Sequence, residues 1–167
     1  MKNFIHISIC GLLKTKSVMK LLFVPLFCAL ISVSFGCRCA PLRVDTYFCN
    51  SDFAIQIRVK SERHDPNSED QLNSWYDIEV VKVYKTNDKV TKAFASGQIW
   101  TGQNSATCGR VFELNQNYII TGYLDPQNNR LRTHTCTFGR LLTNLSNEEK
   151  EFFENTYKSI DCSKLVN

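Results

Sequence analysis

The residues best suited to do chemistry are Cys37 and Cys39, in the segment 37–41. If a signal peptide is removed after Gly36, Cys37 becomes the first residue, and its free α-amino group lies beside its own carbonyl oxygen. These two atoms can close a five-membered chelate ring on a metal ion, and a disulfide at Cys37 would hold them rigid. The segment therefore predicts a metal-binding amino terminus, provided that cleavage occurs at this bond.

An apolar run ahead of this segment predicts export. Residues 21–33 are apolar and follow Lys20, but the run is shorter than the about 20 apolar residues of a membrane anchor. Ser34 and Gly36 place small residues at the positions that signal peptidase reads. We therefore predict that residues 1–36 are a signal peptide, that the protein is secreted to the extracellular space or matrix, and that it does not insert into the membrane.

The mature domain, residues 37–167, is then electrically neutral. The chain has 20 Lys and Arg against 16 Asp and Glu, and residues 1–36 contain four Lys and no acidic residue. A neutral secreted domain gives no electrostatic reason to expect nucleic acid or an anionic membrane as partner. Its length suits one domain with a modest core. Met19, which opens a signal of ordinary length by itself, is an alternative start.

The cysteine content of the mature domain predicts disulfides. An even number of cysteines in an exported chain argues for three disulfides rather than a metal cluster. No two are spaced C-x-x-C, and His64 and His134 are the only histidines left, so a zinc finger is not expected. Spacing alone leaves all 15 pairings open. The six cysteines are Cys37, Cys39, Cys49, Cys108, Cys136 and Cys162.

Apolar residues that alternate with polar ones predict a mainly β fold. Residues 55–59 alternate strictly, and residues 75–84 form a second strand whose apolar positions change parity between Val80 and Val81, as at a β-bulge. Residues 64–73 are polar and typical of a long exposed loop. Five strands with few helices fit a small closed barrel of the OB type. The three other expected strands are residues 98–100, 117–124 and 130–137.

Helices are expected at both ends of the mature domain. Ser146 and Glu149 form a capping box, and apolar residues follow at helical spacing, which predicts one amphipathic helix that reaches Cys162. A short helix is expected at residues 45–49. The chain therefore predicts a barrel with a short amino-terminal helix and a longer carboxy-terminal one.

One glycosylation sequon, Asn144-Leu145-Ser146, lies just before the predicted last helix. In a secreted protein Asn144 would be a glycosylation site. The alternative is that Asn144 and Ser146 only cap the helix, and the sequence leaves both interpretations open.

Catalytic motifs are absent from the sequence. It contains no G-x-S-x-G, no H-E-x-x-H and no glycine-rich phosphate loop. The mature cysteines are expected to be oxidised, which removes a thiol nucleophile. His134 is expected on a strand, as a surface or barrel-wall residue. We therefore predict a protein that is not an enzyme.

The motifs between the cysteines resemble those of a known family, the tissue inhibitors of metalloproteinases, in their amino-terminal, netrin-like inhibitory domain. The resemblance covers residues 37–162. It rests on Cys-x-Cys-x-Pro at the mature terminus and on six cysteines in register with several motifs. The matching segments are Phe48-Cys49-Asn50-Ser51-Asp52, Tyr76-Asp77-Ile78-Glu79, Val83-Tyr84-Lys85, Ser105-Ala106-Thr107-Cys108-Gly109, Tyr118-Ile119-Ile120-Thr121-Gly122 and Thr135-Cys136.

This resemblance implies a secreted, monomeric inhibitor of zinc metalloproteinases of the matrix metalloproteinase, ADAM or astacin type. The amine and carbonyl of Cys37 would chelate the catalytic zinc of the target, and the protein would have no cofactor of its own. The implied disulfides are Cys37–Cys108, Cys39–Cys136 and Cys49–Cys162. The implied protease contacts are Arg38, Cys39, Ala40, Pro41, Ser105, Ala106, Thr107 and Cys108.

The sequence departs from the family pattern at three places. Arg38 replaces a small hydroxyl or apolar residue, and burying a guanidinium without a partner is costly, so a target with a polar or deep pocket is expected. Arg140-Leu141-Leu142 stands where the family usually has a Pro-Trp segment. The sequence ends soon after Cys162, so we expect a single-domain form without the second, six-cysteine domain.

A second function remains open on the sequence. A netrin-like module can bind extracellular matrix, growth factors or a protease without inhibiting it. The amino terminus separates the two functions, because any residue ahead of Cys37 would prevent chelation.

Overall fold

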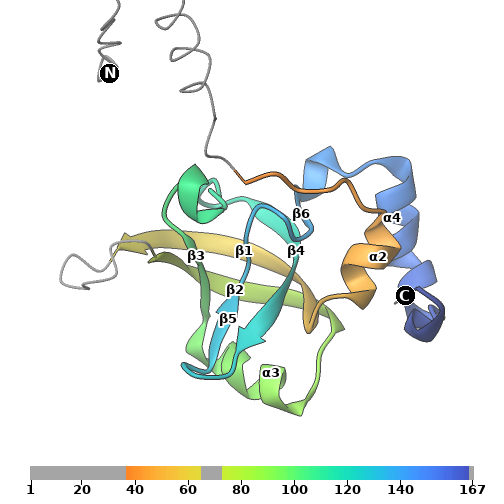
Figure 1. Ribbon diagram of the computed structural model, residues 1–167, viewed down its shortest axis with the longest axis horizontal. Coiled ribbons are helices and arrows are strands. Elements are labelled where there is room, and N and C mark those ends of the chain that lie inside the picture. Colours follow the sequence, from red (N-terminus) through yellow and green to blue (C-terminus); the bar gives the residue numbers. More distant parts are fainter. Residues whose placement is uncertain (1–36, 65–72, 166–167) are drawn as a thin grey trace, which may run out of the picture. The chain divides into compact units, whose positions relative to one another are not determined.

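Six strands and three α-helices make up the part of the chain that the structure, a computed structural model, describes: residues 37–64 and 73–165 (Figure 1). The predicted signal peptide and most of the predicted 64–73 loop lie outside the described residues. The strands are β1 (Phe53–His64), β2 (Asn73–Lys85), β3 (Gln98–Gly102), β4 (Asn117–Asp125), β5 (Arg130–Arg132) and β6 (Gly139–Leu141). The helices are α2 (Val44–Cys49), α3 (Asp88–Ala93) and α4 (Asn147–Glu154).

Five of these strands close into a barrel. The order is β1-β2-β3-β5-β4, and β4 pairs back onto β1. The β3–β5 pairing is parallel and the others are antiparallel. This confirms the predicted closed five-stranded barrel of the OB type. The short strand β6 adds to β4 outside the barrel and was not predicted, because three residues are too few to show an alternating pattern.

The predicted bulge in β2 is present. Ile57 pairs with Val80, and the preceding Gln56 pairs with Lys82, so Val81 is the extra residue. Val81 is consequently 50% exposed, although it is apolar and follows Val80. The bulge lets a long strand bend around the barrel, with Tyr76 and Ile78 inside before it and Val81 and Val83 exposed.

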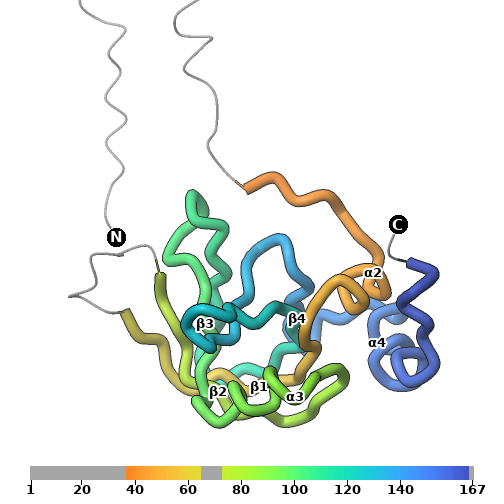
Figure 2. The backbone as a smooth tube through the Cα atoms, turned by 60° about the horizontal axis from the view of Figure 1, so that its bottom comes forward, coloured from red at the N-terminus to blue at the C-terminus, as the bar shows by residue number. Residues whose placement is uncertain are grey.

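The apolar residues form two clusters, one on each side of the β1–β4 pair. Ile55 and Ile120 face the barrel interior, whereas their neighbours Ala54 and Ile119 face the layer made by α2 and α4. The helices α2 and α4 lie side by side on that layer (Figure 2). The second cluster therefore fixes α2, through Val44 and Phe48, against the barrel wall.

The predicted fifth strand was too long. It ends at Arg132, because residues 133–138 form a turn in which the Thr137 N–H donates to the carbonyl of His134 (3.1 Å) and the Thr133 and Thr137 hydroxyls bond each other (2.8 Å). These local threonine bonds compete with strand pairing. His134 therefore lies in a turn and not on a strand.

The predicted last helix was also too long, although its start was right. Ser146 and Glu149 form the expected capping box, but α4 ends at Glu154, where Asn155 leaves the helical region (φ −125°). Short 3-10 turns at Thr156–Lys158 and Cys162–Lys164 continue the chain. The short helix α3 was not predicted at all. No helix within the described residues is long and apolar enough to cross a membrane.

Candidate functional site

The segment 37–41, here called the ridge, runs as an extended chain across one end of the barrel and leads into α2 (Figures 1 and 2). Cys37 is half-buried, and the other four ridge residues are exposed. The hydroxyl of Tyr47 lies 3.5 Å from the carbonyl oxygen of Ala40. Since the ridge has no strand or helix partner in the described chain, its position depends on its covalent anchors.

Two disulfides anchor the ridge. Cys37 is bonded to Cys108, with a Cα–Cα distance of 5.4 Å, and Cys39 to Cys136, with a Cα–Cα distance of 5.1 Å. Both distances are ordinary for a disulfide. A third disulfide, Cys49–Cys162, joins the end of α2 to the last turns of the chain. The pairing is the one that the family resemblance implies.

The loop 104–108 is preorganised beside the ridge. Ser105–Thr107 is a single 3-10 turn, and the side chain of Asn104 accepts hydrogen bonds from the N–H groups of Ala106 and Thr107 at its start. The Thr107 hydroxyl in turn accepts from the Asn104 N–H (3.2 Å). Cys108 ends the turn in the left-handed region, with φ +56°. This reciprocal capping holds Ser105 and Ala106 exposed in a defined shape.

The structure brings the two predicted groups of contact residues together at Cys37. Its Sγ lies 3.5 Å from the carbonyl oxygen of Ser105. This is a van der Waals contact and not a hydrogen bond, because a disulfide sulfur carries no proton. The ridge and the loop 104–108 therefore form one exposed surface.

Residues 133–139, which are the turn 133–138 and the first residue of β6, are here called the Cys136 turn and support the second anchor. The Thr135 N–H donates to the carbonyl of Cys108 (2.9 Å), which connects the two anchor points directly. Within the turn, the Cys136 N–H donates to Nδ1 of His134 (3.0 Å). Burial, aided by nearby guanidiniums, lowers the pKa of His134, which suits its role as an acceptor.

Arg110 is a residue of this site that the sequence analysis missed. Its half-buried guanidinium donates to carbonyl oxygens of the Cys136 turn, at 2.7 Å from Thr137 and 3.0 Å from Gly139. No local pattern marks this arginine, because its partners lie 24 to 29 residues further along the chain. Only the barrel closure places them around it.

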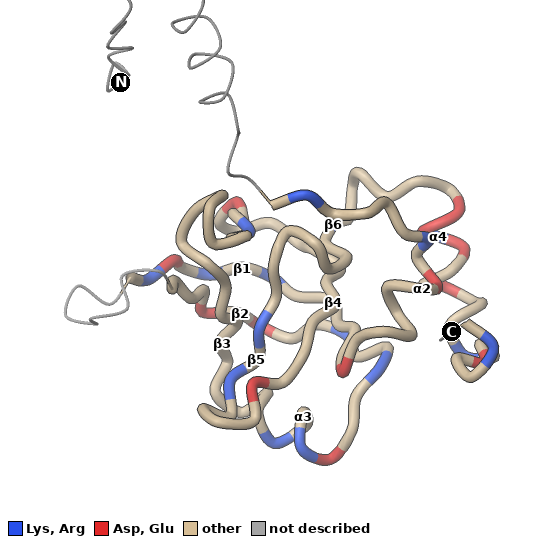
Figure 3. Tube along the Cα trace, viewed as in Figure 1, with Lys and Arg blue, Asp and Glu red and all other residues tan. Residues whose placement is uncertain are grey.

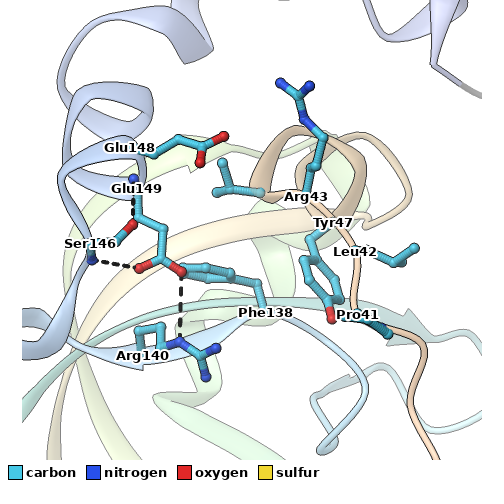
Figure 4. Close-up of a pocket in the computed structure, with 10 residues that line it drawn as sticks. Pro41, Leu42, Arg43, Tyr47, Phe138, Arg140, Ser146, Glu148 and Glu149 are labelled. Carbon is cyan, nitrogen blue, oxygen red and sulfur yellow. Dashed lines mark hydrogen bonds and ion pairs between the residues drawn. The ribbon is translucent and has the colours of Figure 1, made fainter.

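A cavity of about 420 Å³ opens beside the ridge, between Pro41, Tyr47 and the start of α4 (Figure 4). The Glu149 carboxylate accepts from the Ser146 N–H (2.8 Å) and lies 3.6 Å from Nε of Arg140. This carboxylate is therefore occupied in capping the helix and pairing the arginine. Arg140, which belongs to the segment that replaces the usual Pro-Trp, lines this cavity.

The charged and metal-binding groups of the domain are dispersed. Basic and acidic residues are interspersed along the barrel and the helices (Figure 3). Among the described residues, no three His, Cys, Asp or Glu side chains come together as a metal site. The chelating atoms considered above belong to the backbone of Cys37, and its nitrogen is a peptide nitrogen until the bond to Gly36 is cut.

Comparison with known proteins decides the family. The family model described as tissue inhibitor of metalloproteinase matches residues 36–166. The chain belongs to this family. Members of the family inhibit proteases and are not enzymes, so membership confirms that this chain is not an enzyme and supports a role as a metalloproteinase inhibitor.

The similarity to individual members of the family is distant but extensive. The tissue inhibitor of metalloproteinase of Drosophila melanogaster is 25% identical over 153 residues, which is 90% of this chain and 68% of the relative. Metalloproteinase inhibitor 4 of Mus musculus is 26% identical over 128 residues, 73% of this chain and 55% of the relative. Metalloproteinase inhibitor 2 of Homo sapiens is 24% identical over 140 residues, 80% of this chain and 61% of the relative. The match therefore spans little more than half the length of the two mammalian relatives.

Proposed function

We propose that the mature protein is a secreted inhibitor of a zinc metalloproteinase and that Cys37 binds the catalytic zinc through its α-amine and carbonyl oxygen. The observation that carries this proposal is the exposed ridge, anchored by disulfides at both Cys37 and Cys39. Family membership supports the class of target. Removal of residues 1–36 as a signal peptide is part of the proposal, because it creates the amine.

The chemistry of zinc suits this terminus. A catalytic zinc keeps one coordination position open for water, which the amine and carbonyl of Cys37 would displace. The amine must be deprotonated to bind. A free α-amino group has a pKa of about 7.7–8.0, and metal binding releases its proton more readily still. Because the disulfides already order the ridge, little conformational entropy is lost on binding.

The rest of the surface would then lie in the protease cleft. Arg38, Ala40 and Pro41 would extend along the substrate-binding groove from the zinc, and Ser105, Ala106 and Thr107 would lie against its other side. We propose a monomer that acts outside the cell on a metalloproteinase of the matrix metalloproteinase, ADAM or astacin type. The zinc belongs to the target, and the inhibitor needs no cofactor.

The amino terminus tests this mechanism. Intact mass and amino-terminal sequencing of the secreted protein should show a chain that starts at Cys37 and has no free thiol. Inhibition constants are then measured against the catalytic domains of one enzyme of each class. A start upstream of Cys37 in an active inhibitor would contradict chelation.

Adding one alanine before Cys37 is the decisive variant. It converts the amine into an amide, which is a poor zinc ligand, and places an extra residue where the metal must lie. We expect inhibition to weaken by several orders of magnitude at an unchanged melting temperature, and carbamylation of the wild-type amine should act in the same way. A folded, extended protein that inhibits equally well would favour a netrin-like binding module.

A further inference from the structure

Arg110 sits in a cage of backbone carbonyl oxygens. Its Nη2 lies 2.7 Å from the carbonyl oxygen of Thr137, 3.1 Å from that of His134 and 3.3 Å from that of Thr135, and its Nη1 lies 3.0 Å from that of Gly139. Nη2 has two N–H groups for three acceptors, so at least one N–H group is shared between two carbonyl oxygens. Four carbonyls of one short turn therefore converge on a single side chain.

This cage is held by the charge of the guanidinium. No carboxylate of the described residues pairs with it, and its Nε–H has no partner among them. Burial, reinforced by the nearby Arg140, lowers the pKa of Arg110 to about 10, so the side chain stays protonated at neutral pH. Charge-assisted hydrogen bonds are stronger than neutral ones, and the planar fork reaches several acceptors at once.

The backbone of Arg110 is fixed to the barrel. Its N–H donates to the hydroxyl of Thr101 (2.8 Å), a β3 residue that is only 1% exposed. Arg110 also follows Cys108 by two residues, so its backbone starts beside the first ridge anchor. Its guanidinium ends in the turn that carries the second anchor, Cys136.

We propose that Arg110 is a positioning residue for the ridge: by holding the Cys136 turn against the barrel, it sets where Cys39 lies relative to Cys37. This proposal rests on the proposed function, because a misplaced ridge matters only if the ridge binds a protease. The two disulfides limit how far the ridge can move, and the Arg110 cage determines its position within that limit.

The close approach of Gly139 to the guanidinium also supports this assignment. A Cβ atom on Gly139 would lie about 2.5 Å from Cζ and Nη1 of Arg110, and the guanidinium cannot move away without breaking its bonds to the cage. The backbone of the turn therefore approaches Arg110 more closely than any other residue type would allow. A Gly139→Ala variant displaces the guanidinium but keeps its charge in the protein.

The test compares Arg110→Met, Arg110→Lys and Gly139→Ala with the wild type and with Val90→Ala. Val90 belongs to α3, which lies away from the ridge (Figure 1), and its side chain is fully buried in the barrel core. The Val90→Ala variant therefore serves as a destabilised control. Four properties are measured: the melting temperature, the inhibition constant against a matrix metalloproteinase catalytic domain, deuterium exchange at residues 134–138, and the rate at which dithiothreitol reduces Cys39–Cys136.

We expect Arg110→Met and Gly139→Ala to weaken inhibition at least tenfold while the proteins stay folded, with faster exchange in the turn and faster reduction of the disulfide. Arg110→Lys should be intermediate, since an ammonium reaches fewer carbonyls. Val90→Ala should lower the melting temperature but leave the inhibition constant of the folded protein unchanged.

The proposal is overturned if the folded Arg110 and Gly139 variants inhibit like the wild type. It is also overturned if Val90→Ala loses as much inhibition as these variants do for the same decrease in melting temperature. If Arg110→Met fails to fold, the other two variants still decide. If the wild type does not inhibit, the proposed function fails, whereas the exchange and reduction rates still show whether Arg110 positions the turn.

Discussion

Arg38 is the ridge residue that differs most from the residue type expected in the family pattern. It is exposed in the free protein, where water solvates its charge. In a bound complex it would face the pocket next to the scissile position of the protease. An apolar pocket offers no partner for a guanidinium, and removing that charge from water is costly. Selectivity among proteases should therefore depend on this single side chain.

An Arg38→Thr variant should inhibit proteases with apolar pockets about tenfold more strongly than the wild type, which corresponds to about 1.4 kcal/mol. Inhibition constants of both proteins against several such enzymes measure the effect. Arg43→Thr, an exposed arginine just beyond the ridge, is the matched control and should change nothing. A wild type that is already as tight as Arg38→Thr on every enzyme would show that Arg38 stays solvated or finds a carboxylate.

His134 should make stability depend on pH below about 6.5. The folded protein lowers its pKa, whereas the unfolded chain protonates it near pH 6.5. The unfolded state therefore binds the extra proton first, and stability falls as the pH drops below about 6.5, by at most about 1.4 kcal/mol per pH unit. Urea unfolding at a series of pH values measures this slope. A His134→Asn variant that keeps the full slope would assign it to another group.

At the scale of elements, α4 depends on its first turn. The Ser146 hydroxyl accepts from the Glu149 N–H (3.2 Å), and Phe152 and Phe153 of the helix are both buried in the second apolar cluster. The capping box therefore stabilises the first turn of the helix whose aromatic side chains pack in this cluster. Asn144 is exposed and accepts no backbone hydrogen bond of the helix. Its side chain is therefore not needed for the cap, and glycosylation of Asn144 stays a prediction.

Ser146→Ala should destabilise the protein by about 1 kcal/mol, and Ser146→Gly by only a few tenths, because glycine is a tolerated N-cap. Both variants also remove the sequon, so their stabilities are compared by denaturant unfolding of unglycosylated protein. In protein secreted from eukaryotic cells, both should lose the glycan mass, whereas Ser146→Thr should keep it. A Ser146→Ala variant as stable as the wild type would mean that the side-chain cap contributes nothing.

At the scale of the whole molecule, the three disulfides divide into two groups. Cys37–Cys108 and Cys39–Cys136 hold the ridge, whereas Cys49–Cys162 closes a separation of 113 residues on the side of α2 and α4. A disulfide stabilises mainly by restricting the unfolded chain, and the effect grows slowly with loop length. The third disulfide should therefore serve stability more than binding.

Replacing both Cys49 and Cys162 by serine should lower the free energy of unfolding by about 4–5 kcal/mol. The inhibition constant of the folded fraction should stay unchanged, because the ridge keeps both of its anchors. Calorimetry and inhibition assays well below the melting temperature measure the two effects. A large loss of inhibition in folded protein would show that α2 transmits strain to the ridge.

Local patterns in the sequence were enough to predict most elements. The alternation in residues 55–59, the parity change at Val81 and the capping box at Ser146 each involve residues that are only a few positions apart, so the sequence displays them directly. The same reasoning failed where the partner is distant or the element is very short. It extended β5 through the Cys136 turn and missed β6 and α3.

The sequence by itself predicted cleavage after Gly36, which would leave a neutral domain with six cysteines and a chelating terminus at Cys37. It left 15 disulfide pairings open, and the family resemblance selected one of them. Only the tertiary structure decided that the ridge and the loop 104–108 form one surface, and that Arg110 holds the turn beneath it. The physical reason is that these contacts join residues 24 to 97 positions apart, which barrel closure brings together and which no local pattern encodes.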